Sequence, residues 1–304
     1  MVQSTFHLSP FTCHLSRQRG FTLIEMIVVM VITGIIGGMV AMFIKAPVQG
    51  YVDSARRAEM TDIADTALRR LARDIRTAVP NSVRIPAGVI TYIEFLPTRA
   101  GGRYRANATG GTGGCGAIPA DALTFDAADT CFEIVGAPIT FLAGDQIVIG
   151  STQSDGMPPY RSPTSATGIR RAFSGVVGAQ VAKVDITSTV VFPAFAEVQG
   201  QRFNVVPGDQ QAVTYACVGT LNTLDANQDG QAQLIRYSNY GFNPTQSLPT
   251  TAGAPLLADK VSACEIVYDT VNQRNGLVAI RLGITRGGES ISLYQQVHVN
   301  NLPR

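Results

Sequence analysis

The chain has 304 residues, 45% of them hydrophobic and 15% charged. A chain of this length can bury a substantial core and is expected to form one or two domains. Its 24 Lys and Arg residues face 22 Asp and Glu residues, a formal net charge of +2. This balance argues against nucleic acid as a partner, because such a partner requires a concentrated basic patch.

A short basic leader is followed at once by a long apolar segment. Arg17 and Arg19 precede Gly20, and an apolar run of about 24 residues extends from Phe21 to Ile44, long enough for a helix to cross a bilayer. Its only charge is Glu25. A carboxylate at that depth is costly, so it usually has a partner or a function. Cleavage after Gly20 would place a new α-amine one helical turn from Glu25.

The residues Gly20-Phe21-Thr22-Leu23-Ile24-Glu25 resemble the processing and methylation site of type IV prepilins and of type II secretion pseudopilins. The resemblance implies that a prepilin peptidase cuts between Gly20 and Phe21 and methylates the amine of Phe21. It also implies that Glu25 pairs with the N-terminal amine of a neighbouring subunit during assembly. The implied partners are the peptidase, other major and minor pilins, the inner membrane and the pilus assembly machinery.

Two other interpretations of this segment are weaker. A secretory signal peptide is cut after its apolar region, whereas the expected cut here lies before it, so the anchor is kept. An ordinary signal anchor would also hold Arg17 and Arg19 on the cytoplasmic side. It gives no reason for Glu25 or for Gly20 before an aromatic residue. We expect a single-pass protein of the bacterial inner membrane with its head in the periplasm, which then moves to a pilus at the cell surface.

The apolar run passes into an amphipathic helix after Tyr51. Apolar residues recur there at helical spacing, namely Met60, Ile63, Ala64, Ala67, Leu71, Ile75 and Ala78. Val79 precedes Pro80, which disfavours further helix. The pattern predicts one nearly continuous helix over residues 21–79, about 59 residues and roughly 90 Å long. Its candidate weak points are Gly34, Gly37, Gly38 and Pro47.

These signals predict four segments. Residues 1–20 form a leader that is removed, and residues 21–45 form the transmembrane and assembly helix, which ends at Lys45. Residues 46–79 form the amphipathic helix, and residues 80–304 form a strand-rich head. The expected fold class is α+β, a type IV pilin-like fold with the long helix packed on a mainly antiparallel sheet.

Short apolar stretches between turn formers predict the strands of the head. Four candidates are rich in β-branched or other apolar residues, namely residues 89–96, 147–149, 182–187 and 277–282. The Gly-rich stretch from Ala100 to Pro119 is expected to be a long surface loop.

Five cysteines are present, and Cys13 lies in the leader. The other four form an even set on the side of the membrane where disulfides persist, namely Cys115, Cys131, Cys217 and Cys264. Four cysteines allow three connectivities. We favour local pairing, Cys115 with Cys131 and Cys217 with Cys264.

The C-terminal part extends the resemblance. The order of Cys217, residues 233–237, residues 257–264 and residues 276–278 is similar to the larger minor pilins and to J-type pseudopilins. The tail, residues 297–303, is similar to proteins of the mannose-sensitive haemagglutinin (MSHA) pilus biogenesis system.

Candidate catalytic and metal-binding residues are few. Without the leader the only histidine is His298, so histidine-dependent catalysis would rest on that residue alone. Asp225, Asn227 and Asp229 resemble the first half of a calcium loop, but Arg236 stands at its twelfth position, where a bidentate Glu belongs. A tight turn is the preferred interpretation and a calcium-stabilised loop the alternative. A match to G-x-G-x-x-G at Gly111, Gly113 and Gly116 is discounted because no strand and helix flank it.

The preferred hypothesis is a non-enzymatic minor pilin without a cofactor, placed near the pilus tip or in its initiation complex. The nearest alternative is a J-type pseudopilin of a type II secretion machine, in which the anchor and Glu25 would act in the same way. A pilus-borne adhesin is a further alternative, with the Ala100–Pro119 stretch as its only hint, and an anchored enzyme is the last.

Overall fold

The computed structural model describes residues 20–107, 115, 121–153, 157–250, 253–272 and 275–301. It divides into two compact units, one up to Ser54 and one from Ala55 onward. The leader lies outside the described residues apart from Gly20.

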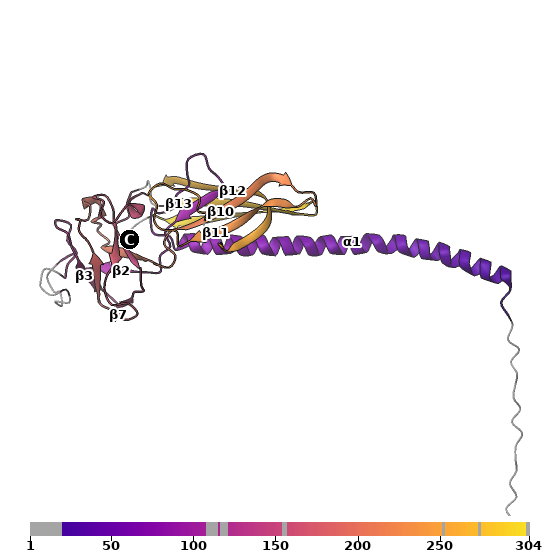
Figure 1. Ribbon diagram of the computed structural model, residues 1–304, viewed down its shortest axis with the longest axis horizontal. Coiled ribbons are helices and arrows are strands. Elements are labelled where there is room, and N and C mark those ends of the chain that lie inside the picture. Colours follow the sequence, from indigo (N-terminus) through magenta and orange to yellow (C-terminus); the bar gives the residue numbers. More distant parts are fainter. Residues whose placement is uncertain are drawn as a thin grey trace, which may run out of the picture. The chain divides into compact units, whose positions relative to one another are not determined.

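Helix α1 extends from Leu23 to Arg76 and contains Pro47 without a break (Figure 1). The helix ends three residues before the predicted position, because the backbone of Thr77 and Val79 bonds to residues 96–98 instead of continuing the helix. Thr77 Oγ1 donates to the carbonyl of Asp74 at 2.8 Å, and the Val79 amide donates to the carbonyl of Leu96 at 2.8 Å.

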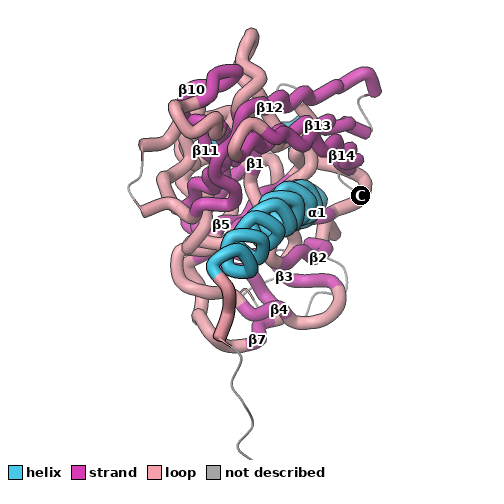
Figure 2. The backbone as a smooth tube through the Cα atoms, turned by 90° about the vertical axis from the view of Figure 1, so that its right-hand side faces the viewer, coloured by secondary structure: helices cyan, strands magenta, loops and turns pink. Residues whose placement is uncertain are grey.

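The second half of α1 packs on a six-stranded antiparallel sheet in the order β1-β10-β11-β12-β13-β14 (Figures 1 and 2). The predicted apolar stripe is the buried one: Met60, Ala64, Ala67, Leu71 and Ile75 are each at most 1% exposed. The strands of this sheet are β1 (Tyr92–Phe95), β10 (Val213–Leu224), β11 (Gly230–Ser238), β12 (Leu256–Asn272), β13 (Asn275–Arg286) and β14 (Glu289–Asn300).

A closed six-stranded barrel is inserted between β1 and β10, although these two strands are hydrogen-bonded neighbours. Its strands are β2 (Ala100–Tyr104), β3 (Cys131–Val135), β5 (Gln146–Ile149), β6 (Arg170–Phe173), β8 (Lys183–Thr187) and β9 (Arg202–Val206). The short strands β4 (Ile139–Thr140) and β7 (Gln180–Val181) pair beside it, and two 3₁₀ turns lie at Pro158–Tyr160 and Ala194–Ala196. The barrel has its own core, which includes Tyr104, Phe132, Phe141, Phe192 and Phe203. The head therefore contains this second β-module in addition to the expected sheet.

The predicted loop from Ala100 is wrong at its start, because Ala100–Tyr104 forms β2. Glycine is required there by close packing: a Cβ on Gly102 would lie 2.9 Å from the ring of Phe203. Residues 108–114 and 116–119 of that stretch lie outside the described residues.

Two of the four predicted strands, residues 147–149 and 277–282, lie within β5 and the longer β13, and β8 covers residues 183–187 of the third. The fourth is shorter than expected, since β1 covers only Tyr92–Phe95 of residues 89–96. The carbonyl of Ile90 instead accepts the Ile266 amide at 2.7 Å, and that of Thr91 accepts the Cys217 amide at 2.8 Å.

Both cysteine pairs are local. Cys115 bonds to Cys131, and Cys217 bonds to Cys264. The second bridge joins β10 to β12, which are separated in the sheet by β11, so it holds together strands that share no ladder.

Removing the second bridge is expected to be the more destabilising change. The Cys217→Ala/Cys264→Ala variant opens a loop with a sequence separation of 47, against 16 for the other pair. The chain-entropy relation gives losses of about 4 and about 3 kcal/mol respectively. Denaturant unfolding of both double variants in non-reducing buffer measures this order. A larger loss for Cys115→Ala/Cys131→Ala would contradict it.

Candidate functional site

The N-terminus of α1 is capped by Thr22, which is not among the residues predicted above to have a role. The carbonyl of Thr22 accepts the amide of Met26 at 3.2 Å, and its Oγ1 accepts the amide of Glu25 at 3.3 Å. Thr22 and Glu25 have the T-x-x-E spacing of a capping box, which could have been read from the sequence. The cap therefore starts the helix two residues after Phe21 and places Glu25 in its first turn.

Every described residue from Gly20 to Lys45 is exposed. Phe21 is 76% exposed, and the large aliphatic residues that follow are similarly uncovered. Among the described residues, α1 is the one helix that is long and apolar enough to cross a membrane. An apolar surface of this extent requires lipid or other helices around it.

Glu25 is the only acidic residue in the first turn of α1, where the helix dipole favours a negative charge. Because the helix begins at Leu23, an amine created at Phe21 would lie at this same end. The segment from Gly20 to Glu25 thus combines a small residue at the expected cut, an aromatic first residue and a carboxylate within one turn. Arg17 and Arg19 lie outside the described residues.

A family model described as the prokaryotic N-terminal methylation motif matches residues 15–42. No curated protein and no solved structure matches the chain. The matched motif, with the apolar helix and the mostly β head behind it, supports a type IV pilin-type protein. It implies processing by prepilin peptidase, a pilus-assembly context and an anchor in the membrane.

The candidate calcium loop in the head, which contains Asp225, Asn227 and Asp229, is held by hydrogen bonds within the protein. Asp225 Oδ1 accepts the amides of Asn227 and Asp229, both at 2.8 Å. Asp229 accepts Lys260 Nζ and, at 2.7 Å, the amide of Gly287. Among the described residues, no group of three or more His, Cys, Asp or Glu side chains is placed to hold a metal. This geometry favours a hydrogen-bonded turn between β10 and β11.

The turn leads to a pH-dependent prediction. The hydrogen bond from Lys260, followed by that from the Gly287 amide, lowers the pKa of Asp229 below its ordinary value of 3.8. A depressed carboxyl pKa contributes stability above the ordinary value, and this stability is lost as the pH falls through the folded-state value. The gap in melting temperature between wild type and Asp229→Asn should therefore narrow from about pH 7 to about pH 3. A constant gap would contradict this role for Asp229.

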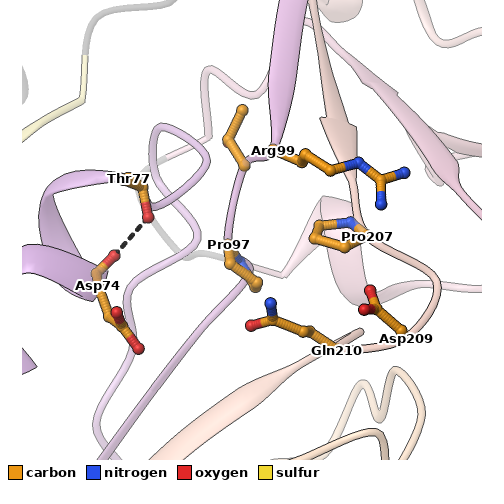
Figure 3. A pocket seen from close by; sticks show the side chains of 8 residues that line it. Asp74, Thr77, Pro97, Arg99, Pro207, Asp209 and Gln210 are labelled. Carbon is orange, nitrogen blue, oxygen red and sulfur yellow. Dashed lines mark hydrogen bonds between the residues drawn. The ribbon is translucent and has the colours of Figure 1, made fainter. Parts of the chain in front are cut away.

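A small cleft of about 210 Å³ lies where α1 ends (Figure 3). Its lining includes Asp74, Pro97 and Gln210. The Asp74 carboxylate is already engaged, because it accepts the Tyr215 hydroxyl at 2.7 Å and Arg236 Nε at 2.9 Å. These contacts tie the end of the helix to β10 and β11, which is a structural role.

A buried ion pair joins Glu94 on β1 to Arg84 in the segment that precedes this strand. Arg84 and Glu94 are 7% and 1% exposed, and Arg84 Nη2 lies 2.6 Å from Glu94 Oε1. The same guanidinium donates to the carbonyls of Asn243 and Pro244 and lies 3.5 Å from the ring centroid of Tyr160. Burial raises the pKa of Glu94, and Arg84 opposes that rise. The pair fastens the loop after β11 and the barrel-side turn at Tyr160 to β1.

The other candidate residues are placed as follows. His298 is exposed on β14, and Cys115 is disulfide-bonded and therefore not a free nucleophile. Gly111, Gly113 and Gly116 lie outside the described residues.

Proposed function

We propose that this chain is a non-enzymatic minor pilin, cut between Gly20 and Phe21, methylated at Phe21 and incorporated through α1 into a type IV pilus. The observation that carries the proposal is the methylation motif over residues 15–42, with Glu25 in the first turn of an exposed apolar helix. In hydrocarbon, the ionised Glu25 is tolerable only beside a cation. The methylated amine of a neighbouring subunit supplies that cation and sets the register of docking.

The resemblance of the C-terminal tail directs the proposal to the MSHA pilus system and to a component like its O protein, at the tip or in the initiation complex. A head that carries an inserted barrel is larger than a filament repeat requires, which favours a component present in few copies. The pilin-like arrangement of helix and sheet, with the head in the periplasm before assembly, is part of the same proposal.

A strain lacking this chain tests the proposal. We expect loss of surface pili with normal type II secretion, and restoration by the wild-type gene. Gly20→Val should fail to restore pili and should accumulate with its leader attached, because a branched side chain replaces the small residue at the cut. Loss of secretion with intact pili would instead identify a pseudopilin.

A further inference from the structure

The two edges of the six-stranded sheet are treated differently by the chain. The outer edge of β1 is covered, because Arg84 and Glu94 exchange backbone hydrogen bonds of 2.9 and 3.0 Å, and Ala78 bridges to Pro97. At the other edge, β14 is the last strand of the sheet, and no described strand pairs with its outer side between Ser290 and His298. One edge is therefore closed by the chain itself and the other is open.

The open edge lacks the features that usually prevent edge-to-edge pairing. β14 has 12 residues, and its register with β13 is continuous from Glu289 to Asn300 without a bulge. Between Ser290 and Asn300 there is no Lys, Arg, Asp, Glu or Pro. Natural edge strands are commonly kept short, charged, bulged or covered. A long, regular and uncharged edge is suited to accepting another strand.

The turn into β14 shows which backbone groups face outward. Gly287 and Gly288 have φ values of 59° and 81° between the paired residues Arg286 and Glu289, as in a two-residue type I′ hairpin. In such a hairpin the closing pair is hydrogen-bonded, and bonded pairs then alternate along the ladder. The even-numbered residues from Ser290 to His298 therefore direct their N–H and C=O groups to the open edge.

The side chains of β14 indicate what an added strand would contact. Ile291 and Leu293 pack at the rim of the helix–sheet core and are only partly covered. On the opposite face, Ser292, Tyr294 and Gln296 are exposed. An added strand would match these two faces if its apolar residues lay on the α1 side, beside Ile291 and Leu293, and its uncharged polar residues lay on the opposite side.

Strand direction limits the partner, given the proposed function. Subunits that bundle through α1 run in the same direction and keep their helices on one side. Antiparallel pairing of two β14 strands would point the helices in opposite directions, and parallel pairing would place them on opposite faces of the joined sheet. A neighbour in the same orientation must offer its opposite edge, and in a second copy of this chain that edge is closed by residues 78–84.

We propose that β14 pairs, antiparallel, with an open edge strand of a different pilin-type subunit. This inference rests on the proposed function as a pilus subunit. It adds the class of partner and the surface that the partner contacts.

Site-specific photocrosslinking in the native cell tests this contact. A photoreactive residue at Ser292 should yield a cross-link whose peptide, identified by mass spectrometry, belongs to another protein with a prepilin-type N-terminus. The same probe at Gln233, exposed on the central strand β11, is the matched control and should give little product. A peptide from this chain, a protein without that motif, no product, or equal yield at Gln233 would each overturn the proposal.

A backbone change separates edge pairing from side-chain contact. Gln296→Pro removes one outward N–H while leaving the ladder to β13 intact, and it should lower the cross-link yield roughly tenfold. Gln296→Thr keeps the N–H and should retain the product. If the proline variant does not accumulate, Gln296→Lys places a charge at the same edge and should give the same loss. Unchanged yield in the accumulating variant would overturn edge pairing. The N-terminus is analysed in the same sample, so that methylated Phe21 without a cross-link refutes the edge contact alone.

Discussion

Glu25→Ala is expected to leave leader cleavage largely intact and to abolish incorporation of the protein into pili. The carboxylate lies in the first turn of an exposed apolar helix, at the end where cleavage creates an amine. Removing one member of a desolvated charge pair leaves the other uncompensated, at a cost of about 3–5 kcal/mol. That loss corresponds to a reduction of at least about a hundredfold in the equilibrium constant for docking to a neighbouring subunit. Immunoblots of sheared pili and of membranes measure both quantities.

The charge can be separated from the shape of the side chain. Glu25→Gln keeps the size of the side chain and removes only its charge, so it should fail like the alanine variant. Glu25→Asp keeps the charge on a shorter side chain and should retain part of the function. Normal incorporation of Glu25→Gln would show that pairing with a cation is not what Glu25 contributes.

Arg84→Met is expected to destabilise the head by about 3–5 kcal/mol, because it leaves Glu94 charged and buried without its partner. Its pH dependence has a definite sign. Burial already raises the pKa of Glu94, and loss of Arg84 removes the main opposing influence, so the folded-state value rises further. A raised carboxyl pKa means that the folded state binds the proton more tightly, so the variant should regain stability as the pH falls through that value. Denaturant unfolding at several pH values measures the effect.

A double variant identifies the cause of that loss. Arg84→Met/Glu94→Gln removes the unpaired buried charge. It keeps a side chain that can form hydrogen bonds with Thr214 and Tyr240, the other partners of Glu94. It should recover much of the stability lost by Arg84→Met alone. If the double variant is as unstable as the single one, the contacts of Arg84 with Tyr160 and the carbonyls of residues 243 and 244 account for the loss instead.

Features that depend on local sequence patterns could be predicted. Apolar periodicity places Met60, Ala64 and Leu71 on one helical face, and these residues are buried against the sheet. The structure shows the local cysteine pairing that we favoured, although the sequence alone does not distinguish it from the other two connectivities. The capping role of Thr22 has an equally local signal in its spacing from Glu25.

The rest depends on contacts between residues far apart in the chain. Closure of the barrel requires β2 to pair with β9, about a hundred residues later, and no periodicity indicates that pairing. Gly101 and Gly102 predict a loop from composition, yet the packing of Phe203 makes them strand residues. The sequence also gives no indication that Arg84 is buried, because its charge is compensated by Glu94 and by carbonyls more than 150 residues away.

The mature N-terminus tests the central claim most directly. Mass spectrometry of the protein purified from its native membrane and from sheared pili should show a chain that begins with N-methylated Phe21. A chain that retains Met1 and the leader in both fractions would contradict the account.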